Sequence, residues 1–245
     1  KVMTMYVEGI GDGARFMEVA KRFSLKKPII LLKAGKSEAG STAVSSHTGS
    51  LAGSYAVFKS AMKQSNVMLT KSLEEMFELA KVLSTQVPAK ENSIAIITNA
   101  GGPGVLTADY CEKLGVGLAK LRLGVIEALE KSGRMHHAYS RTNPLDIVGD
   151  ALPDRYAIAI DLLLQEKNVA GLIVIQTLQT MTDPVKDAET IIAAHKKHPD
   201  KPIITAFMGG KYTKPGTELL EKNNIPNYND VLKAVKAMKI LIDRG

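Results

Sequence analysis

A single histidine lies in a long, uncharged run of small residues. His47 lies within residues 39–58, a stretch rich in Gly, Ser, Ala and Thr that carries no formal charge. A neutral imidazole keeps a free lone pair on one ring nitrogen near pH 7, so it can attack a phosphoryl group. The phosphohistidine would be negatively charged, and backbone N–H groups such as those of Thr48 and Gly49 would bind it. The stretch therefore predicts a nucleophilic histidine on a long loop.

Other chemistry at this histidine is less well supported. Ser46 precedes His47, but neighbours in sequence rarely point at each other productively, and no G-x-S-x-G elbow is present. A metal site needs several ligands, and this stretch offers one. The remaining alternative is a flexible, solvent-exposed loop with an incidental histidine, although connections longer than about 12–15 residues are usually functional or disordered.

A second candidate site follows a buried apolar run at residues 94–98. The segment TNAGGPGVLTADY contains glycines that let the backbone approach a ligand, and a helix start behind them directs free N–H groups outward. We expect no carboxylate nearby. The alternative is an ordinary strand-to-helix turn that needs glycine for its dihedral angles. The expected phosphate-binding residues are Asn99, Ala100, Gly101, Gly102 and Gly104.

Two motifs that resemble nucleotide sites are incomplete. The segment KAGKS at 33–37 lacks the first glycine of a P-loop, and GIGDG at 9–13 lacks the third glycine of a dinucleotide fingerprint. No metal site is expected either, because the clustered histidines have no cysteine partners and no repeated spacing. We interpret them as surface or local structural residues: His136, His137, His195 and His198.

Composition narrows the class of protein. The 245 residues carry a net charge of +7, but Lys and Arg are dispersed, which favours solubility and attraction for phosphates over nucleic-acid binding. A single cysteine, Cys111, excludes an internal disulfide and fits a buried, inert thiol in a reducing, cytoplasmic compartment. No apolar run reaches the roughly 18 residues that would span a membrane. The N-terminus reads as a strand and not as a signal peptide.

Strand and helix patterns alternate along the chain, which indicates an α/β fold with parallel sheets covered by helices on both faces. The polar stretch 86–92 is the expected linker between a domain at 1–85, truncated to about three strands, and a five-strand domain at 93–245. Ligands bind beyond the carboxyl ends of such strands, where the candidate residues lie. Strands are expected at 2–7, 28–32, 66–70, 94–98, 115–119, 172–175, 202–207 and 225–228.

Four segments in order resemble one enzyme family over essentially the whole chain. SSHTGSLAGS, TNAGGPGVLTADYCEKLG, NPLDIVGDA and NNIPNYNDVLKAVKAM are similar to segments of the ADP-forming acetyl-CoA synthetases, which are NDP-forming acyl-CoA synthetases related to succinyl-CoA synthetase. The resemblance implies two flavodoxin-like domains. It also implies an acid–thiol ligase that converts acyl-CoA, ADP and phosphate to a carboxylic acid, CoA and ATP through a phosphohistidine.

The resemblance also implies roles for particular residues and for missing parts. His47 corresponds to the phosphorylated residue, Glu8 to the acidic partner of its ring, and Gly101 and Gly102 to the start of one of two phosphate-holding helices. ATP or ADP, Mg and CoA belong to the complete enzyme. The CoA-binding domain, the first βα units of the histidine domain and the ATP-grasp domain or beta subunit are absent from this sequence. We therefore expect one part of a hetero-oligomer, inactive as an isolated chain.

Two other functions remain open at this point. Some relatives are regulatory or scaffold modules fused to a protein acetyltransferase, and these commonly lack the histidine that is present here. A plain flavodoxin-like binding domain is the third possibility, and the four co-occurring motifs argue against it. The carboxylic acid itself cannot be read from the residues: acetate is the default, with branched or aryl acids open.

Overall fold

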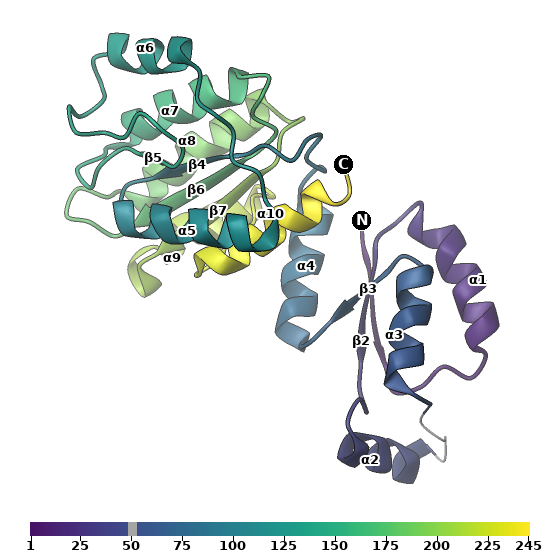
Figure 1. Ribbon diagram of the computed structural model, residues 1–245. Helices are drawn as coiled ribbons and strands as arrows, with labels where there is room; N and C mark the ends of the chain where they lie inside the picture. The colour runs from purple at the N-terminus through teal and green to yellow at the C-terminus, as the bar shows by residue number, and fades with distance from the viewer. Residues whose placement is uncertain (49–52) are drawn as a thin grey trace. The chain divides into compact units, whose positions relative to one another are not determined.

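Two parallel α/β units make up the chain. The computed structural model describes residues 1–48 and 53–245, and it divides into compact units at Lys1–Ser84 and Thr85–Gly245 (Figure 1). Each unit has one parallel sheet with helices on both faces. The predicted fold class, two parallel-sheet α/β domains, is therefore confirmed.

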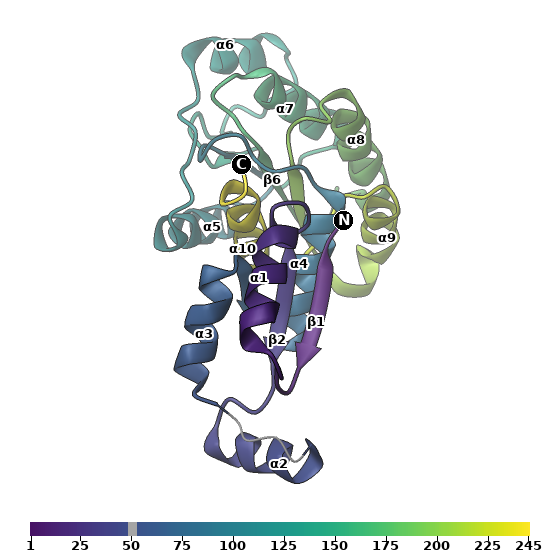
Figure 2. The same cartoon turned by 90° about the vertical axis from the view of Figure 1, so that its right-hand side faces the viewer.

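The first unit has the strand order β1-β2-β3, with β2 buried on both faces. Successive residues of β2 point to opposite sides. Ile29 and Leu31 pack under α1 and α3, whereas Ile30 and Leu32 pack against α4 (Figures 1 and 2). The elements are β1 (Met3–Val7), α1 (Gly13–Ser24), β2 (Ile29–Lys33), α2 (Glu38–Thr48), α3 (Tyr55–Gln64), β3 (Val67–Thr70) and α4 (Leu73–Thr85).

Much of the stretch predicted as a loop is helical. Residues 38–48 form α2, and only residues after Thr48 separate it from α3. Two of its hydroxyls bond back to carbonyls of the same helix: Thr42 Oγ1 donates to Glu38 O at 3.0 Å and Ser46 Oγ donates to Ala43 O at 2.8 Å. These bonds satisfy the hydroxyl groups locally, although they add little to the stability of the helix. The prediction of a loop over this part was wrong.

The second unit has the strand order β5-β4-β6-β7. Helices α5 and α10 cover one face, and α6 to α9 cover the other (Figure 1). Its strands are β4 (Ala95–Thr98), β5 (Leu145–Asp146), β6 (Leu172–Thr177) and β7 (Ile203–Met208). Its helices are α5 (Gly101–Leu114), α6 (Leu123–Lys131), α7 (Pro153–Gln165), α8 (Pro184–Lys197), the short η1 (Gly210–Tyr212), α9 (Lys214–Lys222) and α10 (Val231–Ile242).

Two predicted strands of this unit are reduced to single bridges. The bridges join Leu118 to Ile94 and Asn227 to Thr205, and the sheet gains the unpredicted two-residue strand β5 instead. Side-chain amides of two asparagines accept hydrogen bonds from strand N–H groups that a longer neighbouring strand would otherwise bind. Asn143 Oδ1 accepts from Ile96 N at 2.9 Å, and Asn227 Oδ1 accepts from Phe207 N at 2.9 Å.

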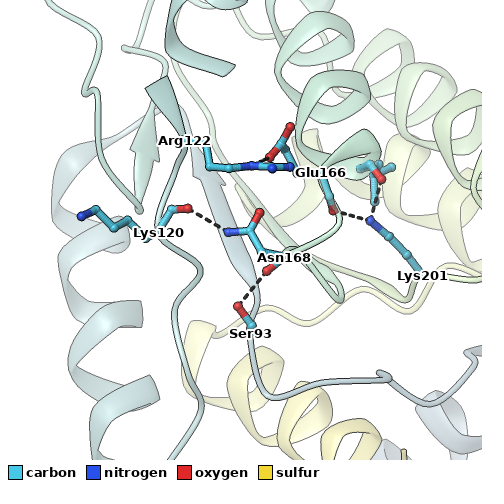
Figure 3. A network of polar contacts seen from close by, with 7 residues as sticks. Ser93, Lys120, Arg122, Glu166, Asn168 and Lys201 are labelled. Carbon is cyan, nitrogen blue, oxygen red and sulfur yellow. Dashed lines mark hydrogen bonds and ion pairs between the residues drawn. The ribbon is translucent and has the colours of Figure 1, made fainter. Parts of the chain in front are cut away.

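The amino edge of the second sheet is closed by a polar network (Figure 3). Ser93 Oγ donates to Asn168 O at 2.7 Å, and Asn168 Nδ2 donates to Lys120 O at 2.9 Å. Lys201 Nζ donates to Leu164 O and Glu166 O, both at 2.7 Å, and so satisfies carbonyls at the end of α7. These contacts tie the segments that precede β4, β6 and β7 to one another.

The stretch predicted as a linker, 86–92, falls within the second unit and hydrogen-bonds to the rest of it. Gln86 Oε1 accepts from Ile203 N at 2.9 Å, and Gln86 Nε2 donates to Asn224 O at 2.7 Å. Ala89 N donates to Leu241 O at 3.1 Å. The proposed domain boundaries, 1–85 and 93–245, stay a prediction.

A buried carboxyl lies in the core of the second unit. Asp187 on α8 is fully buried, and Gln176 Nε2 donates to its Oδ2. Among the described residues, Asp187 Oδ1 and Gln176 Oε1 have no hydrogen-bond partner. Burial raises the pKa of Asp187 to about 7, and the nearby charge of Asp183 adds to the rise, while the bond from Gln176 opposes it.

This carboxyl predicts a pH dependence of stability. An unfolded Asp has a pKa of about 3.9, so between about pH 4 and pH 7 the folded chain binds more protons than the unfolded chain. The free energy of unfolding should therefore fall as pH rises through this window, by up to about 4 kcal/mol. Asp187→Asn should remove this slope and be more stable than the natural chain at pH 8. Denaturant unfolding at several pH values checks this.

The matched control is Glu189→Gln, an exposed acid on the same helix. It should leave the slope unchanged. Equal pH profiles for the natural chain and Asp187→Asn would contradict the assignment.

Candidate functional site

The candidate residues of the first unit lie at the carboxyl edge of its sheet. Glu8 directly follows β1, and Lys33 is the last residue of β2. Lys33 Nζ donates to the backbone oxygen of Glu8 at 2.7 Å and also to Ala34 O. The half-buried Glu8 is thus held in place through its backbone, while its carboxylate stays available at the edge.

The helix that carries His47 begins beside the end of β2. Gly35 has a φ of +68°, and a Cβ atom on it would lie 2.9 Å from Val44 Cγ2 and 3.4 Å from Gly40 O. A Cβ on Gly40 would lie 3.2 Å from Gly35 Cα. These two glycines let α2 approach the turn after β2 closely. Ser37 Oγ accepts from Gly40 N at 3.2 Å and supports the first turn of α2.

His47 and Thr48 are the last two residues of α2. Their side chains, and Gly49 altogether, lie outside the described residues. The pairing of Glu8 with the His47 ring therefore stays a prediction, as do phosphate contacts from Thr48 and Gly49.

The candidate residues of the second unit surround the start of α5. Ala100 has extended backbone and is the N-cap, without a side-chain hydrogen bond, and the first turn contains no acidic residue. Gly101 and Gly102 are exposed, and a Cβ on Gly102 would meet nothing within 4 Å. Exposed backbone N–H groups at a helix start, with the positive end of the helix dipole behind them, suit an anion.

Asn99 and Gly104 have structural tasks that the sequence did not reveal. Asn99 Oδ1 accepts from Thr177 N at 2.7 Å, and Asn99 Nδ2 donates to Thr177 O at 2.8 Å, so this buried amide joins the ends of β4 and β6. A Cβ on Gly104 would lie 2.9 Å from Thr98 Cγ2, so Gly104 allows α5 to pack on β4. Whether either residue also contacts phosphate is untested.

A carboxylate lies at the start of α5, contrary to the expectation of none. A Cβ on Gly101 would lie 3.1 Å from Asp146 Oδ2. Asp146 ends β5, and its Oδ1 accepts from Val148 N at 2.9 Å. Because β5 pairs with β4 in parallel, Asp146 and the residues after Thr98 meet at one edge despite their distance in sequence. The Asp146 carboxylate would therefore repel an anion that binds at this candidate site.

Three other reactive side chains, Cys111, His136 and His198, have structural surroundings. Cys111 is fully buried on α5, and burial raises the pKa of its thiol to about 12, so the prediction of a buried, inert thiol is confirmed. His136 Nδ1 accepts from Ala138 N at 3.1 Å, and His198 Nε2 lies 3.4 Å from Asp161 Oδ1. Within residues 1–48 and 53–245, no three or more His, Cys, Asp or Glu side chains gather as a metal site. None of the helices described there could cross a membrane.

Comparison with known families matches both units. Residues 1–83 match the succinyl-CoA ligase like flavodoxin domain, and residues 94–240 match the Ligase-CoA domain. The chain belongs to the Ligase-CoA domain family. Its two sheets are thus the flavodoxin-like sheets that the sequence motifs predicted.

Individual relatives of this Ligase-CoA family member are synthetases. It is 45% identical to the alpha subunit of acetate–CoA ligase (ADP-forming) II of Pyrococcus furiosus, over 97% of this chain and 53% of the relative. It is 38% identical to acetate–CoA ligase (ADP-forming) I of Archaeoglobus fulgidus, over 98% of this chain and 33% of the relative. The chain thus spans about half of the first relative and a third of the second.

The fold of the chain is also similar to that of a solved synthetase structure. The chain is similar to the dinucleotide-forming acetyl-coenzyme A synthetase 1 of Ca. Korarchaeum cryptofilum in complex with phosphate and ADP, with a TM-score of 0.90 and 36% identity. The similarity covers 98% of this Ligase-CoA family member and 52% of that chain.

The carboxylate at the anion site gives a testable prediction. Removing the charge of Asp146 should strengthen phosphate binding at the start of α5, because two negative charges a few ångströms apart repel by about 1–4 kcal/mol near a protein surface. Asp146→Asn should bind inorganic phosphate about tenfold more tightly, measured by calorimetric titration with amide shifts of Gly101 and Gly102 as the local readout.

Asp109→Asn is the matched control, because it removes the same charge from an exposed position farther along α5. It should change the affinity less than about twofold. Equal effects of the two substitutions would show that only net charge matters and that Asp146 is not at the phosphate site.

Proposed function

We propose that this chain is the phosphohistidine-bearing part of an ADP-forming acyl-CoA synthetase. The observation that supports this most is that His47 lies in the last turn of α2, in a chain whose relatives are named acetate–CoA ligases (ADP-forming). The overall reaction is acyl-CoA + ADP + phosphate ⇌ carboxylic acid + CoA + ATP. The presence of His47 disfavours a purely regulatory or scaffold module.

In this proposal His47 takes the phosphoryl group from an acyl phosphate and passes it to ADP. Phosphate displaces CoA from the thioester and gives an acyl phosphate. The free ring nitrogen of His47 then attacks phosphorus, the P–O bond to the acyl group breaks, and the carboxylate leaves. ADP finally takes the phosphoryl group from the ring. The first step forms a C–O bond as the C–S bond to CoA breaks, and in the two later steps one bond to phosphorus forms as another breaks, so no oxidant or reductant is needed.

In the first unit, Glu8 supplies the electrostatics at the proposed nucleophile. The Glu8 carboxylate accepts the N–H of the His47 ring, which fixes the tautomer and stabilises positive charge on the ring. Lys33 holds Glu8 through its backbone oxygen. In the second unit, the exposed N–H groups at the start of α5 bind phosphate in this proposal, and the neighbouring Asp146 carboxylate weakens that binding.

The complete enzyme needs parts beyond this chain. We assign CoA binding, and ATP or ADP with Mg, to a CoA-binding domain and an ATP-grasp domain or beta subunit. A likeness covering about half of a synthetase solved with phosphate and ADP supports this division. The chain alone is then inactive, and a hetero-oligomeric or longer protein performs the turnover.

The nucleophile is tested by labelling. With its partner parts present, the protein should incorporate phosphate from ATP on His47 as a phosphoramidate, which is lost in acid and survives alkali. His47→Ala should abolish both the label and turnover, because no neighbour can replace an imidazole nucleophile. His137→Ala, at an exposed histidine, is the control and should label normally. An acid-stable label, or normal turnover by His47→Ala, would overturn the proposal.

The orienting carboxylate is tested by rate. Glu8→Gln should still label His47 but at least about tenfold more slowly, because an amide orients the ring without stabilising its positive charge. The serine-protease carboxylate, whose loss lowers kcat by about 10⁴-fold, marks the upper range. Glu18→Gln removes the same charge from an exposed position on α1 and should leave the rate unchanged. Equal rates for the two variants would exclude Glu8 from the transfer.

A further inference from the structure

A buried pair of polar side chains lies close to the carboxyl edge of the second sheet. Gln176 is the last but one residue of β6, Asp187 lies in the first turn of α8, and both are fully buried. Gln176 Nε2 donates to Asp187 Oδ2. The other two oxygens of the pair, Asp187 Oδ1 and Gln176 Oε1, have no hydrogen-bond partner among the described residues. Buried polar atoms are normally hydrogen-bonded, so these two oxygens need a physical explanation.

The two unpartnered oxygens lack one donor between them. An ionised carboxylate and an amide oxygen can only accept, so they cannot bond to each other. A proton on Asp187 Oδ1 turns that atom into a donor for Gln176 Oε1. The carboxyl and the amide then form a ring closed by two hydrogen bonds, in which each group donates once and accepts once. Burial, which raises the pKa of Asp187 to about 7, acts in the same direction.

A short chain of bonds connects this pair to the candidate anion site. Thr177 follows Gln176 in β6, and Asn99 binds both of its backbone groups. Asn99 Oδ1 accepts from Thr177 N at 2.7 Å, and Asn99 Nδ2 donates to Thr177 O at 2.8 Å. Ala100, the next residue after Asn99, is the N-cap of α5. The position of Gln176 is therefore passed on to the start of α5 through one peptide and one amide side chain.

We propose that a proton on Asp187 closes the carboxyl–amide ring with Gln176, and that this ring positions the end of β6 for anion binding at the start of α5. The inference rests on the phosphate site of the proposed function and adds the way in which that site is regulated. Loss of the proton opens the ring, which releases Gln176, and leaves a buried negative charge, which repels an anion. Both effects weaken anion binding, so Asp187 is a positioning residue whose proton favours the bound state.

Other titratable groups surround Asp187. The charge of Asp183, the N-cap of α8, disfavours ionisation of Asp187, and burial lowers the pKa of His195 farther along the same helix. On α7, burial and the charge of Asp187 hold the pKa of Tyr156 well above its ordinary value, and its hydroxyl donates to Ile175 O at 2.9 Å. β6 carries no charged residue. The other charged residues on the helices packed against α8 are Asp154, Arg155 and Asp161 on α7 and Lys214, Glu218, Glu221 and Lys222 on α9.

The coupling is tested with sulfate, which stays a dianion near neutral pH, where phosphate changes its charge. Sulfate affinity is measured by calorimetric titration, with amide shifts of Gly101 and Gly102 as the local readout. It should fall about tenfold between about pH 5.5 and pH 8.5, since couplings between two sites in proteins are typically about 5–150-fold. Histidines of this unit lose positive charge over the same range, so the decisive quantity is the difference from Asp187→Asn.

Asp187→Asn imitates the protonated acid, because its amide can donate to Gln176 Oε1 and accept from Gln176 Nε2 without a proton that can be lost. It should bind sulfate like the natural chain at the lower pH and about tenfold more tightly than the natural chain at the higher pH. Glu189→Gln, at an exposed acid on the same helix, is the matched control and should keep the natural pH dependence. Gln176→Met removes the ring, so it should bind sulfate weakly even at the lower pH.

The proton itself is observed by carbon-13 NMR of the aspartate carboxyl groups in the natural chain. One resonance, absent from Asp187→Asn, should titrate with a pKa of about 7. Saturating sulfate should raise this pKa by about one unit, because a tenfold coupling is reciprocal and the anion-bound form holds the proton more tightly.

Each part of the inference can fail separately. A carboxyl of Asp187 that is still ionised at the lower pH would assign the missing donor to a buried water and overturn the inference. The same pH dependence of sulfate affinity in the natural chain and Asp187→Asn would overturn the coupling alone, and normal binding by Gln176→Met at the lower pH would overturn the positioning role of the ring. Absence of sulfate binding at Gly101 and Gly102 in every protein would overturn the phosphate site of the proposed function and this inference with it.

Discussion

Parallel pairing of strands is the constraint on which both candidate sites depend. It sends every strand of a sheet toward the same edge, so residues that follow different strands meet there. In the first unit this brings Glu8 after β1 next to Lys33 at the end of β2. In the second unit it brings the start of α5 next to Asp146. Residues more than twenty positions apart become neighbours without any long-range recognition of their own.

Side chains complete the hydrogen bonding where short strands end. Asn99 joins β4 to β6 through both atoms of its amide, and Asn143 and Asn227 take the places of missing backbone partners. A buried peptide group without a partner is costly, so these amides stabilise the sheet, and Asn99 does so at the carboxyl edge where the candidate site lies. The exposed Gly101 and Gly102 are then available for a ligand, because Asn99 and Gly104 beside them make the structural contacts.

Much of this arrangement could be predicted from the residues. Continuous apolar runs such as 94–98 predicted buried parallel strands, and Gly101 with Gly102 predicted an open helix start, because both signals are local. The helix α2 was missed since its Gly, Ser and Thr residues have weak helix preference, and its support comes from the contact of Gly35 with Gly40. Asp146 was missed because its place beside Gly101 follows from strand order, which no local pattern encodes.

The two helices that carry candidate residues, α2 in the first unit and α5 in the second, are anchored very differently. On α5, Gly104, Thr107 and Cys111 are buried, and Gly104 packs directly on β4. On the described part of α2, Val44 is the buried side chain. Because local opening is easiest where few apolar contacts hold an element, α2 should open at a lower free energy than α5. A phosphate cradle benefits from rigidity, since preorganised N–H groups need no rearrangement during transfer. In the proposed function, a nucleophile that serves two phosphoryl partners in turn benefits from the opposite, and the fewer buried side chains on the described part of α2 would allow it.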